Sequence, residues 1–153
     1  MSDPLVFLMG EYRAEFPQDR NYAENHMWAQ PAAEQGVWRF GFTAYAVRLL
    51  QDVYFLDWAI DAPAILDLRQ EIGSIESKKA ESALYSPLAG KLVRFNQKLM
   101  QDPTAINTDK YGEGWLFEIE SPGDSLLQPG EYVAHLDRVW EKTQRTIKGQ
   151  MNQ

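Results

Sequence analysis

Two runs in which large apolar side chains occupy every second position constrain the fold of this chain most strongly. The alternating residues are Trp38, Phe40 and Phe42 in the first run and Trp115, Phe117 and Ile119 in the second. A period of two residues is typical of a β-strand that buries one face. We therefore expect two half-buried strands, over residues 37–42 and 115–120, the second of which follows a turn at Gly112-Glu113-Gly114.

The rest of the pattern predicts a mainly β fold with few helices. Val53–Trp58 is apolar on both faces and is expected to lie inside a β-sandwich. Thr43 can cap a short helix over Ala44–Leu50. After Pro129, apolar residues recur at three- and four-residue intervals, which predicts an amphipathic helix running to about Ile147. Several short strands with few helices indicate a sandwich or barrel closed by this C-terminal helix.

Length and charge narrow the domain organisation and the possible partners. A chain of 153 residues predicts one domain, which we place at residues 18–147, between an N-terminal extension (1–17) and a C-terminal tail (148–153). The net charge of −7 argues against nucleic acid and anionic membranes, because both would repel the chain. There is no cysteine, and no apolar run reaches the roughly 20 residues that span a bilayer. Asp3 stands where a secretory signal has basic residues, so we expect a cytoplasmic protein.

A pair of adjacent lysines, Lys78 and Lys79, stands between two strand-like segments. Residues 71–75 predict a short strand before the pair, and residues 83–90 lead through a turn signal into another strand at residues 91–95. A lysine at the tip of such a hairpin projects into solvent, where a modifying enzyme can reach its amine. Taken alone, such a pair is usually a solvated, charged turn.

Four elements taken together resemble the H-protein of the glycine cleavage system. They are His26-Met27-Trp28, residues 41–46, the lysine segment over residues 75–90, and residues 107–116. The resemblance covers residues 21–147 and implies a barrel-sandwich hybrid fold, with a lipoyl group amide-linked to a lysine. The family has Glu three residues before that lysine and Ala directly after it. Glu76 and Ala80 meet both conditions for Lys79, so we expect Lys79 to carry the cofactor, lipoate.

The resemblance also implies a set of partner enzymes. A lipoate ligase or lipoyl transferase would attach the cofactor, and glycine decarboxylase, aminomethyltransferase and dihydrolipoamide dehydrogenase would then act on it. The chain would be a carrier without catalytic residues that shuttles a lipoyl-bound aminomethyl intermediate. Tethering turns each encounter into a local search, at effective concentrations on the order of mM.

The chain departs from the family at positions that hold the amine. Met27 stands where the family usually has Glu, Asn25 where well-known members have Ser, and Ala83 where a second acid commonly follows the lysine. Glu81 would share a strand face with Ala83 and could replace one acid in part. Met27 can equally be a core residue, because methionine fills irregular gaps.

Three functions stay open on the sequence alone. The chain is a lipoyl carrier of glycine cleavage, a related carrier for another pathway such as sulfur oxidation or lipoyl relay, or an interaction module without the cofactor. No metal site is expected, because no spacing joins His26 and His135 to carboxylates. We expect His26 to be a structural residue beside Trp28, and His135 to lie on a face of the terminal helix.

Overall fold

The computed structural model describes the backbone of residues 2–151 and the side chains of residues 2–144. The strands are β1 (Leu5–Met9), β2 (Tyr12–Phe16), β3 (Asn21–Tyr22), β4 (Met27–Pro31), β5 (Val37–Phe42), β6 (Val53–Trp58), β7 (Ala64–Leu66), β8 (Glu71–Ser77), β9 (Glu81–Tyr85), β10 (Gly90–Phe95) and β11 (Phe117–Glu120). The helices are α1 (Ala44–Leu50), α2 (Gln97–Gln101), α3 (Ala105–Thr108) and α4 (Pro129–Met151). The expected fold class, mainly β with short helices and a C-terminal helix, is confirmed.

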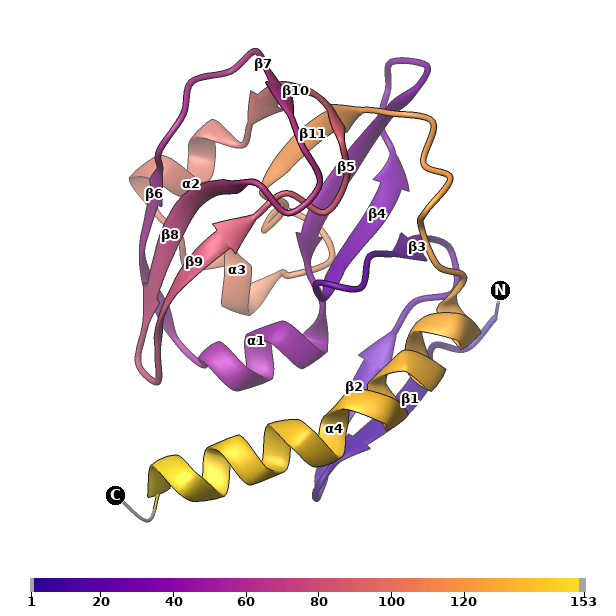
Figure 1. The fold of residues 1–153 in the computed structure, drawn as a ribbon, viewed down its shortest axis with the longest axis vertical. Helices are drawn as coiled ribbons and strands as arrows, with labels where there is room; N and C mark the ends of the chain where they lie inside the picture. The colour runs from indigo at the N-terminus through magenta and orange to yellow at the C-terminus, as the bar shows by residue number, and fades with distance from the viewer. Residues whose placement is uncertain (1, 152–153) are drawn as a thin grey trace.

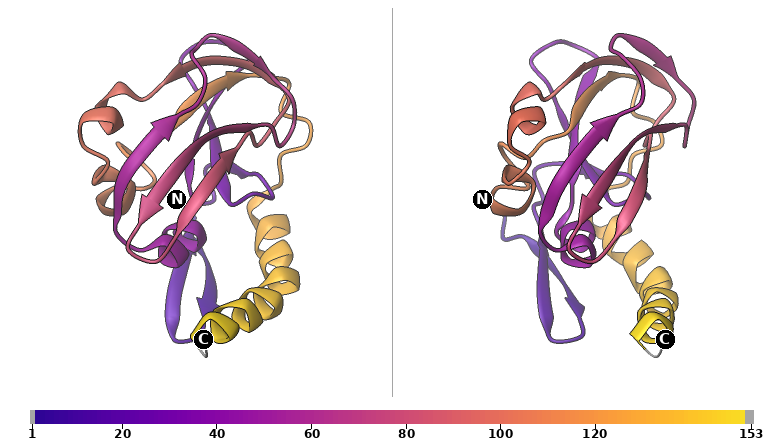
Figure 2. Two further views of the ribbon diagram at one scale, coloured as in Figure 1. Left: turned by 60° about the vertical axis from the view of Figure 1, so that its left-hand side comes forward. Right: turned by 90° about the vertical axis from the view of Figure 1, so that its left-hand side faces the viewer.

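Two sheets face one another across the main core (Figure 1). One sheet has six strands in the order β3-β4-β5-β11-β10-β7, and the other has three in the order β6-β8-β9. Phe40, Leu92 and Phe117 enter the core from the larger sheet, and Leu56 and Ile75 enter it from the smaller one. The tip of the β8–β9 hairpin lies beside α1 in all three views (Figures 1 and 2).

A second apolar core lies between the β1–β2 hairpin, α1 and α4 (Figure 2). Phe16 of β2 meets Tyr132 of α4 edge to face, with 5.4 Å between ring centres. Phe7 of β1 meets Trp140 of α4 in the same way at 6.2 Å. Such aromatic pairs contribute roughly 0.5–1.5 kcal/mol beyond the burial of their area. The β1–β2 hairpin therefore supplies part of the packing that holds α4 against the rest of the molecule.

The expectation that Val53–Trp58 lies inside the sandwich is wrong. This segment is β6, an edge strand of the three-stranded sheet, and the side chains of Tyr54 and Phe55 are 63% and 47% exposed. A β-bulge between Val53 and Phe55 breaks the alternation of the strand, so two successive side chains face solvent. Periodicity alone cannot distinguish such an edge from a buried strand, because a short apolar run fits both.

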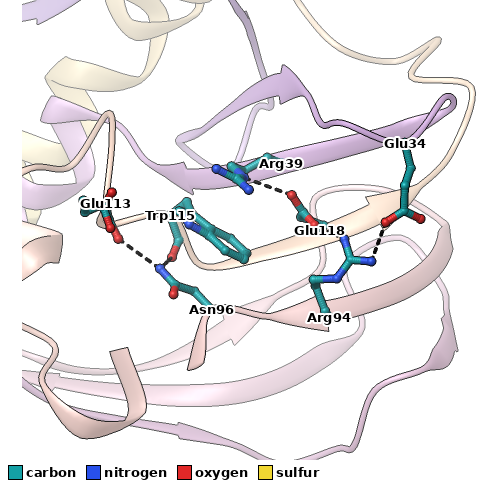
Figure 3. Close-up of polar contacts among 7 residues, drawn as sticks. All are labelled: Glu34, Arg39, Arg94, Asn96, Glu113, Trp115 and Glu118. Atoms are coloured by element: carbon teal, nitrogen blue, oxygen red, sulfur yellow. Dashed lines mark hydrogen bonds and ion pairs between the residues drawn. The ribbon is translucent and has the colours of Figure 1, made fainter. Parts of the chain in front are cut away.

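The strand expected over residues 115–120 also differs in part from the prediction. The strand starts only at Phe117, and Glu118, which the alternation assigns to the outer face, is 2% exposed. The carboxylate of Glu118 accepts a hydrogen bond from Arg39 of β5 at 2.9 Å and forms an ion pair with Arg94 of β10, which also pairs with Glu34 (Figure 3). Two cations from neighbouring strands thus compensate one buried charge at the centre of the larger sheet.

The predicted first residues of the two helices are confirmed. The hydroxyl of Thr43 accepts a hydrogen bond from the Ala46 amide at 3.4 Å, at the N-terminus of α1. α4 begins at Pro129 and ends at Met151, four residues beyond the expected end at Ile147. Its apolar stripe buries Tyr132 and Leu136. In the described part of the chain, no helix is long and apolar enough to cross a membrane.

Replacing Glu118 with Gln should lower the free energy of unfolding. The change keeps the shape of the side chain but removes the charge that two arginines share, and both guanidinium groups can still be hydrated because they are partly exposed. We predict a loss of about 1–3 kcal/mol in urea denaturation. Glu113→Gln is the control, since its ion pair with Lys98 is exposed on both sides and should be worth less than about 1 kcal/mol. Equal losses would contradict the role given to Glu118.

The N-terminal hairpin can be tested through one buried ring. Phe16 is fully buried between Tyr22 and Tyr132. Phe16→Ala should lower the free energy of unfolding by about 3–5 kcal/mol, because it leaves a cavity in the second core. Leu8→Ala, on the exposed face of the same hairpin, should cost less than about 0.5 kcal/mol. If urea denaturation gave similar small values for both, the hairpin would not stabilise the fold.

Candidate functional site

The candidate site is the tip of the β8–β9 hairpin. The turn runs from Ser77 to Ala80, and Lys78 and Lys79 between them are both exposed. The Ser77 amide donates to the Ala80 carbonyl at 2.8 Å, and the Ser77 hydroxyl accepts from the Ala80 amide at 3.2 Å. Among the described side chains, no ion pair involves either lysine. Lys79 therefore stands where the sequence predicts it, at a hairpin tip and open to solvent.

The backbone of this tip is attached to the segment that follows α1. The Lys78 amide donates to the Asp52 carbonyl at 2.8 Å, just beyond the pair that Val53 of β6 forms with Ser77 of β8. Asn107 of α3 binds the same segment from its other side, through a hydrogen bond to the Val53 amide at 2.8 Å. The turn is thus held by residues 52 and 53, whose backbone Asn107 binds in turn, while the Lys79 side chain is exposed.

Three of the four sequence elements that carry the family resemblance meet at Trp28. The Trp28 ring packs on Gly41, where a Cβ atom would come within 2.6 Å of the ring, so only glycine fits. The Trp28 indole nitrogen donates to the Lys110 carbonyl at 2.9 Å. Three elements therefore converge on Trp28, and the lysine hairpin joins them through Asp52 and Asn107.

His26 is a structural residue, as expected, but Tyr132 is the partner that holds it. Its Nδ1 atom lies 2.9 Å from the Tyr132 hydroxyl, which lies 3.0 Å from the Thr43 hydroxyl. The His26 backbone has a φ of 70°, and its ring centre is 5.9 Å from that of His135 on α4. Burial, with a smaller effect from His135, lowers the pKa of His26 to about 4. Across the described residues, no three His, Asp or Glu side chains gather into a group that could bind a metal ion.

The positions where the family has amine-holding groups are now defined in space. Met27 is 2% exposed and belongs to the main core, so it is a packing residue. Ala83 is half-buried on β9, and Glu81 on the same strand is exposed. The Asn25 amide nitrogen donates to the Tyr85 carbonyl at 3.1 Å, and its buried side-chain oxygen has no hydrogen-bond partner. Asn25 therefore keeps an unpartnered acceptor in the buried space next to β9, and Glu81 keeps an exposed carboxylate on that strand.

A groove of about 590 Å³ opens between α4 and the end of β9. His135 and Val139 line it from α4, and Tyr85 lines it from β9. Of the residues that line it in the described part of the chain, Glu24 alone carries a carboxylate, and this group lies 3.8 Å from the Arg69 guanidinium at the surface. The groove is thus mainly apolar, with this one ion pair and several neutral polar groups along it.

Sequence reasoning did not single out the residues that support the lysine turn. Asp52 contributes only its backbone, which no residue-type pattern reveals. Asn107 opens one of the four quoted elements, but its residue type does not show which backbone groups its side chain binds. Its partner Val53 is 54 positions away in the sequence, so only the folded structure identifies it.

The lowered pKa of His26 makes stability depend on pH. Its folded value of about 4 lies below the ordinary 6.5, so the unfolded chain binds the proton first as the pH falls, and stability present above pH 6.5 is lost toward pH 4. The loss approaches about 3 kcal/mol. His26→Asn, which tolerates positive φ, should flatten the profile of unfolding free energy in this window, whereas the control His135→Asn should keep most of its slope. An unchanged slope in His26→Asn would contradict this assignment.

Comparison with known proteins agrees with this arrangement. The family model described as glycine cleavage H-protein matches residues 20–138, which begin after β2. A probable glycine cleavage system H protein from Natronomonas pharaonis is 40% identical over 128 residues, covering 80% of this chain and 97% of that protein. The glycine cleavage system H protein of Mycolicibacterium gilvum is 41% identical over 113 residues, covering 74% of this chain and 85% of that protein.

A solved structure shows the same likeness in three dimensions. The crystal structure of a glycine cleavage system H protein from Mycobacterium marinum matches with a TM-score of 0.68 and 32% identity, covering 78% of this chain and 97% of that one. Because the family model and relatives above 30% identity each cover most of the chain, the assignment does not depend on fold alone. This chain belongs to the glycine cleavage H-protein family.

Proposed function

We propose that this chain is the lipoyl carrier of a glycine cleavage system, with lipoate amide-linked to the Nζ atom of Lys79. Membership of the H-protein family supports the carrier function. The exposed position of Lys79 at a hairpin tip, between Glu76 and Ala80, is the observation that supports the attachment site. Proteins of this family are carriers and not catalysts, so the chain presents a reactive group to other enzymes.

The residues at the tip fit a covalently attached acyl group. The amine of Lys79 is exposed and forms no ion pair with a described side chain, and the neighbouring Ala80 adds little bulk. Bound lipoate would supply a disulfide that can be reduced and loaded. The protein's own part is to keep the turn rigid and separate from the core, which the contacts of Ser77 and Lys78 achieve. Lys78 differs from Lys79 because its flanking residues lack the Glu and Ala spacing of the family.

A second function deserves a test because of Met27 and Ala83. Neither side chain can hold a cationic cargo by charge, and Met27 is part of the core. Beside β9 lie the buried, unpartnered oxygen of Asn25 and the exposed carboxylate of Glu81, and the two carboxylates that the family resemblance leads us to expect are absent. This substitution favours a lipoyl carrier for another pathway, such as sulfur oxidation or lipoyl relay, as the alternative.

The partners that we propose follow from the chemistry of the glycine cleavage cycle. A lipoate ligase or lipoyl transferase would modify Lys79, and glycine decarboxylase, aminomethyltransferase and dihydrolipoamide dehydrogenase would bind the loaded chain in the cytoplasm. The net charge of −7 favours basic docking surfaces on these enzymes. We propose residues 18–147 as the carrier domain, residues 1–17 as an extension that packs on α4, and residues 148–153 as a tail.

Lys79→Arg should abolish modification. Co-expression with a lipoate ligase and lipoate should add the mass of one lipoyl group to the wild-type chain and to Lys78→Arg, but none to Lys79→Arg, because Arg offers no acylatable amine. Intact-mass spectrometry measures this directly. A lipoyl group on Lys79→Arg would place the site elsewhere, and an unmodified wild type would favour an interaction module without the cofactor.

Reconstitution separates the two carrier functions. The lipoylated chain with glycine decarboxylase should support exchange between glycine and labelled bicarbonate, because the arm must accept the group that remains after decarboxylation. Met27→Glu would restore the residue that the family usually has, but it would bury a charge in the main core. Asn25→Ser restores the residue of well-known members without adding a charge, so it is the variant to assay beside the wild type. A lipoylated wild type without exchange activity would favour the carrier for another pathway.

A further inference from the structure

One residue beside the lysine hairpin has a backbone conformation that its side chain disfavours. Gln51, directly after α1, has φ 60° and ψ −141°. Glycine adopts this combination readily, but a residue with a Cβ atom does so only when its surroundings enforce it. Such strained residues often lie at functional sites. The contacts that enforce this conformation are therefore of interest.

Asn107 of α3 supplies those contacts with both polar groups of its side chain. Its amide nitrogen donates to the Gln51 carbonyl at 2.6 Å, and its amide oxygen accepts from the Val53 amide at 2.8 Å. The side chain thus spans Asp52 and fixes the backbone on either side of it. The Gln51 amide is also engaged, because it donates to the Val47 carbonyl at 2.8 Å.

The carbonyl of Asp52, between the two clamped residues, accepts the hydrogen bond from the Lys78 amide. Apart from the pairing of Ser77 with Val53, the other contacts of the turn are local, within Ser77 to Ala80. Asn107 therefore holds the Asp52 carbonyl in place. That carbonyl in turn binds the amide of Lys78, the residue next to Lys79. Loss of the clamp would let Gln51 relax to an ordinary φ and carry the Asp52 carbonyl away from the turn.

We propose that Asn107 is a positioning residue for the acylation of Lys79. This inference rests on the proposed function. In the acylation step, the Nζ atom forms an amide bond with the carbonyl carbon of an activated acyl group such as an acyl adenylate, the bond from that carbon to its leaving group breaks, and the amine proton goes to solvent. A turn that is already ordered presents Nζ to the enzyme without the entropy cost of ordering it on binding.

Asn96 provides a matched control. It is a second asparagine whose side chain clamps distant backbone, donating to the carbonyls of Glu113 and Trp115 at 2.9 and 2.8 Å (Figure 3). Asn96→Ala thus removes a clamp of the same kind from a segment that does not contact the lysine turn. Both alanine variants should lose stability, but Asn107→Ala alone should change the turn.

Lipoylation kinetics and hydrogen exchange of the full-length chain test the proposal. In Asn107→Ala, kcat/KM of a lipoate ligase for the chain should fall about tenfold, mainly through KM, and the Lys78 amide should exchange about tenfold faster by NMR. Asn96→Ala should match the wild type in both measurements. Asn107→Asp, which keeps the acceptor for Val53 but loses the donor to Gln51, should lie between them and serves if the alanine variant does not fold.

A suppressor variant distinguishes positioning from a general loss of stability. Adding Gln51→Gly to Asn107→Ala should restore much of the Lys78 protection and of kcat/KM, because glycine adopts the native φ and ψ without the clamp. Unchanged kinetics and exchange in Asn107→Ala, or equal changes in Asn96→Ala, would overturn the inference while the proposed function stands. A wild-type chain that takes no lipoyl group would overturn both.

Discussion

The hydrogen bond from the Lys78 amide to the Asp52 carbonyl joins the tip of the β8–β9 hairpin to the end of α1. A hairpin that extends past its sheet would otherwise fray, because its last residues have few apolar contacts. This bond and the pairing of Val53 with Ser77 extend the ordered backbone to the residue before Lys79. The exposed Lys79 side chain therefore stands on a backbone whose position is set by hydrogen bonds and strand pairing.

Two apolar cores stabilise the fold that carries this hairpin. The main core joins the two sheets, and the second core holds α4 through the N-terminal hairpin. Tyr132 contributes to both the second core and the polar contacts of His26 and Thr43, so α4 is coupled to the start of α1. This packing also positions one wall of the groove between α4 and β9, because His135, which lines the groove, lies on α4.

The sequence predicted the parts of the fold that local patterns encode, but not those that depend on distant partners. The strand at residues 37–42, the capped helix after Thr43 and the start of α4 follow from periodicity and capping alone. β6 was misplaced because an apolar edge strand and a core strand have similar composition. Alternation places Glu118 on the outer face of its strand, and it cannot show that Arg39 and Arg94 come from other strands to compensate its charge.

The candidate site also combines features that local patterns predict with features that depend on distant residues. A turn between two strands predicted the exposed position of Lys79, and the flanking Glu76 and Ala80 distinguished it from Lys78. The support of that turn by Asn107 joins residues more than 50 positions apart, which no local pattern contains. Met27 was recognised as a departure from the family, and burial in the main core explains why the chain tolerates it.

Site-resolved mass spectrometry of the protein isolated from its own cells tests the central claim most directly. Proteolytic peptides that span residues 70–94 would be sequenced by fragmentation to locate any added acyl group. The account predicts a single lipoyl group on the Nζ atom of Lys79, with Lys78 unmodified. A lipoyl group on Lys78, or a chain without any acyl group when other lipoylated proteins of the same cells carry theirs, would contradict it.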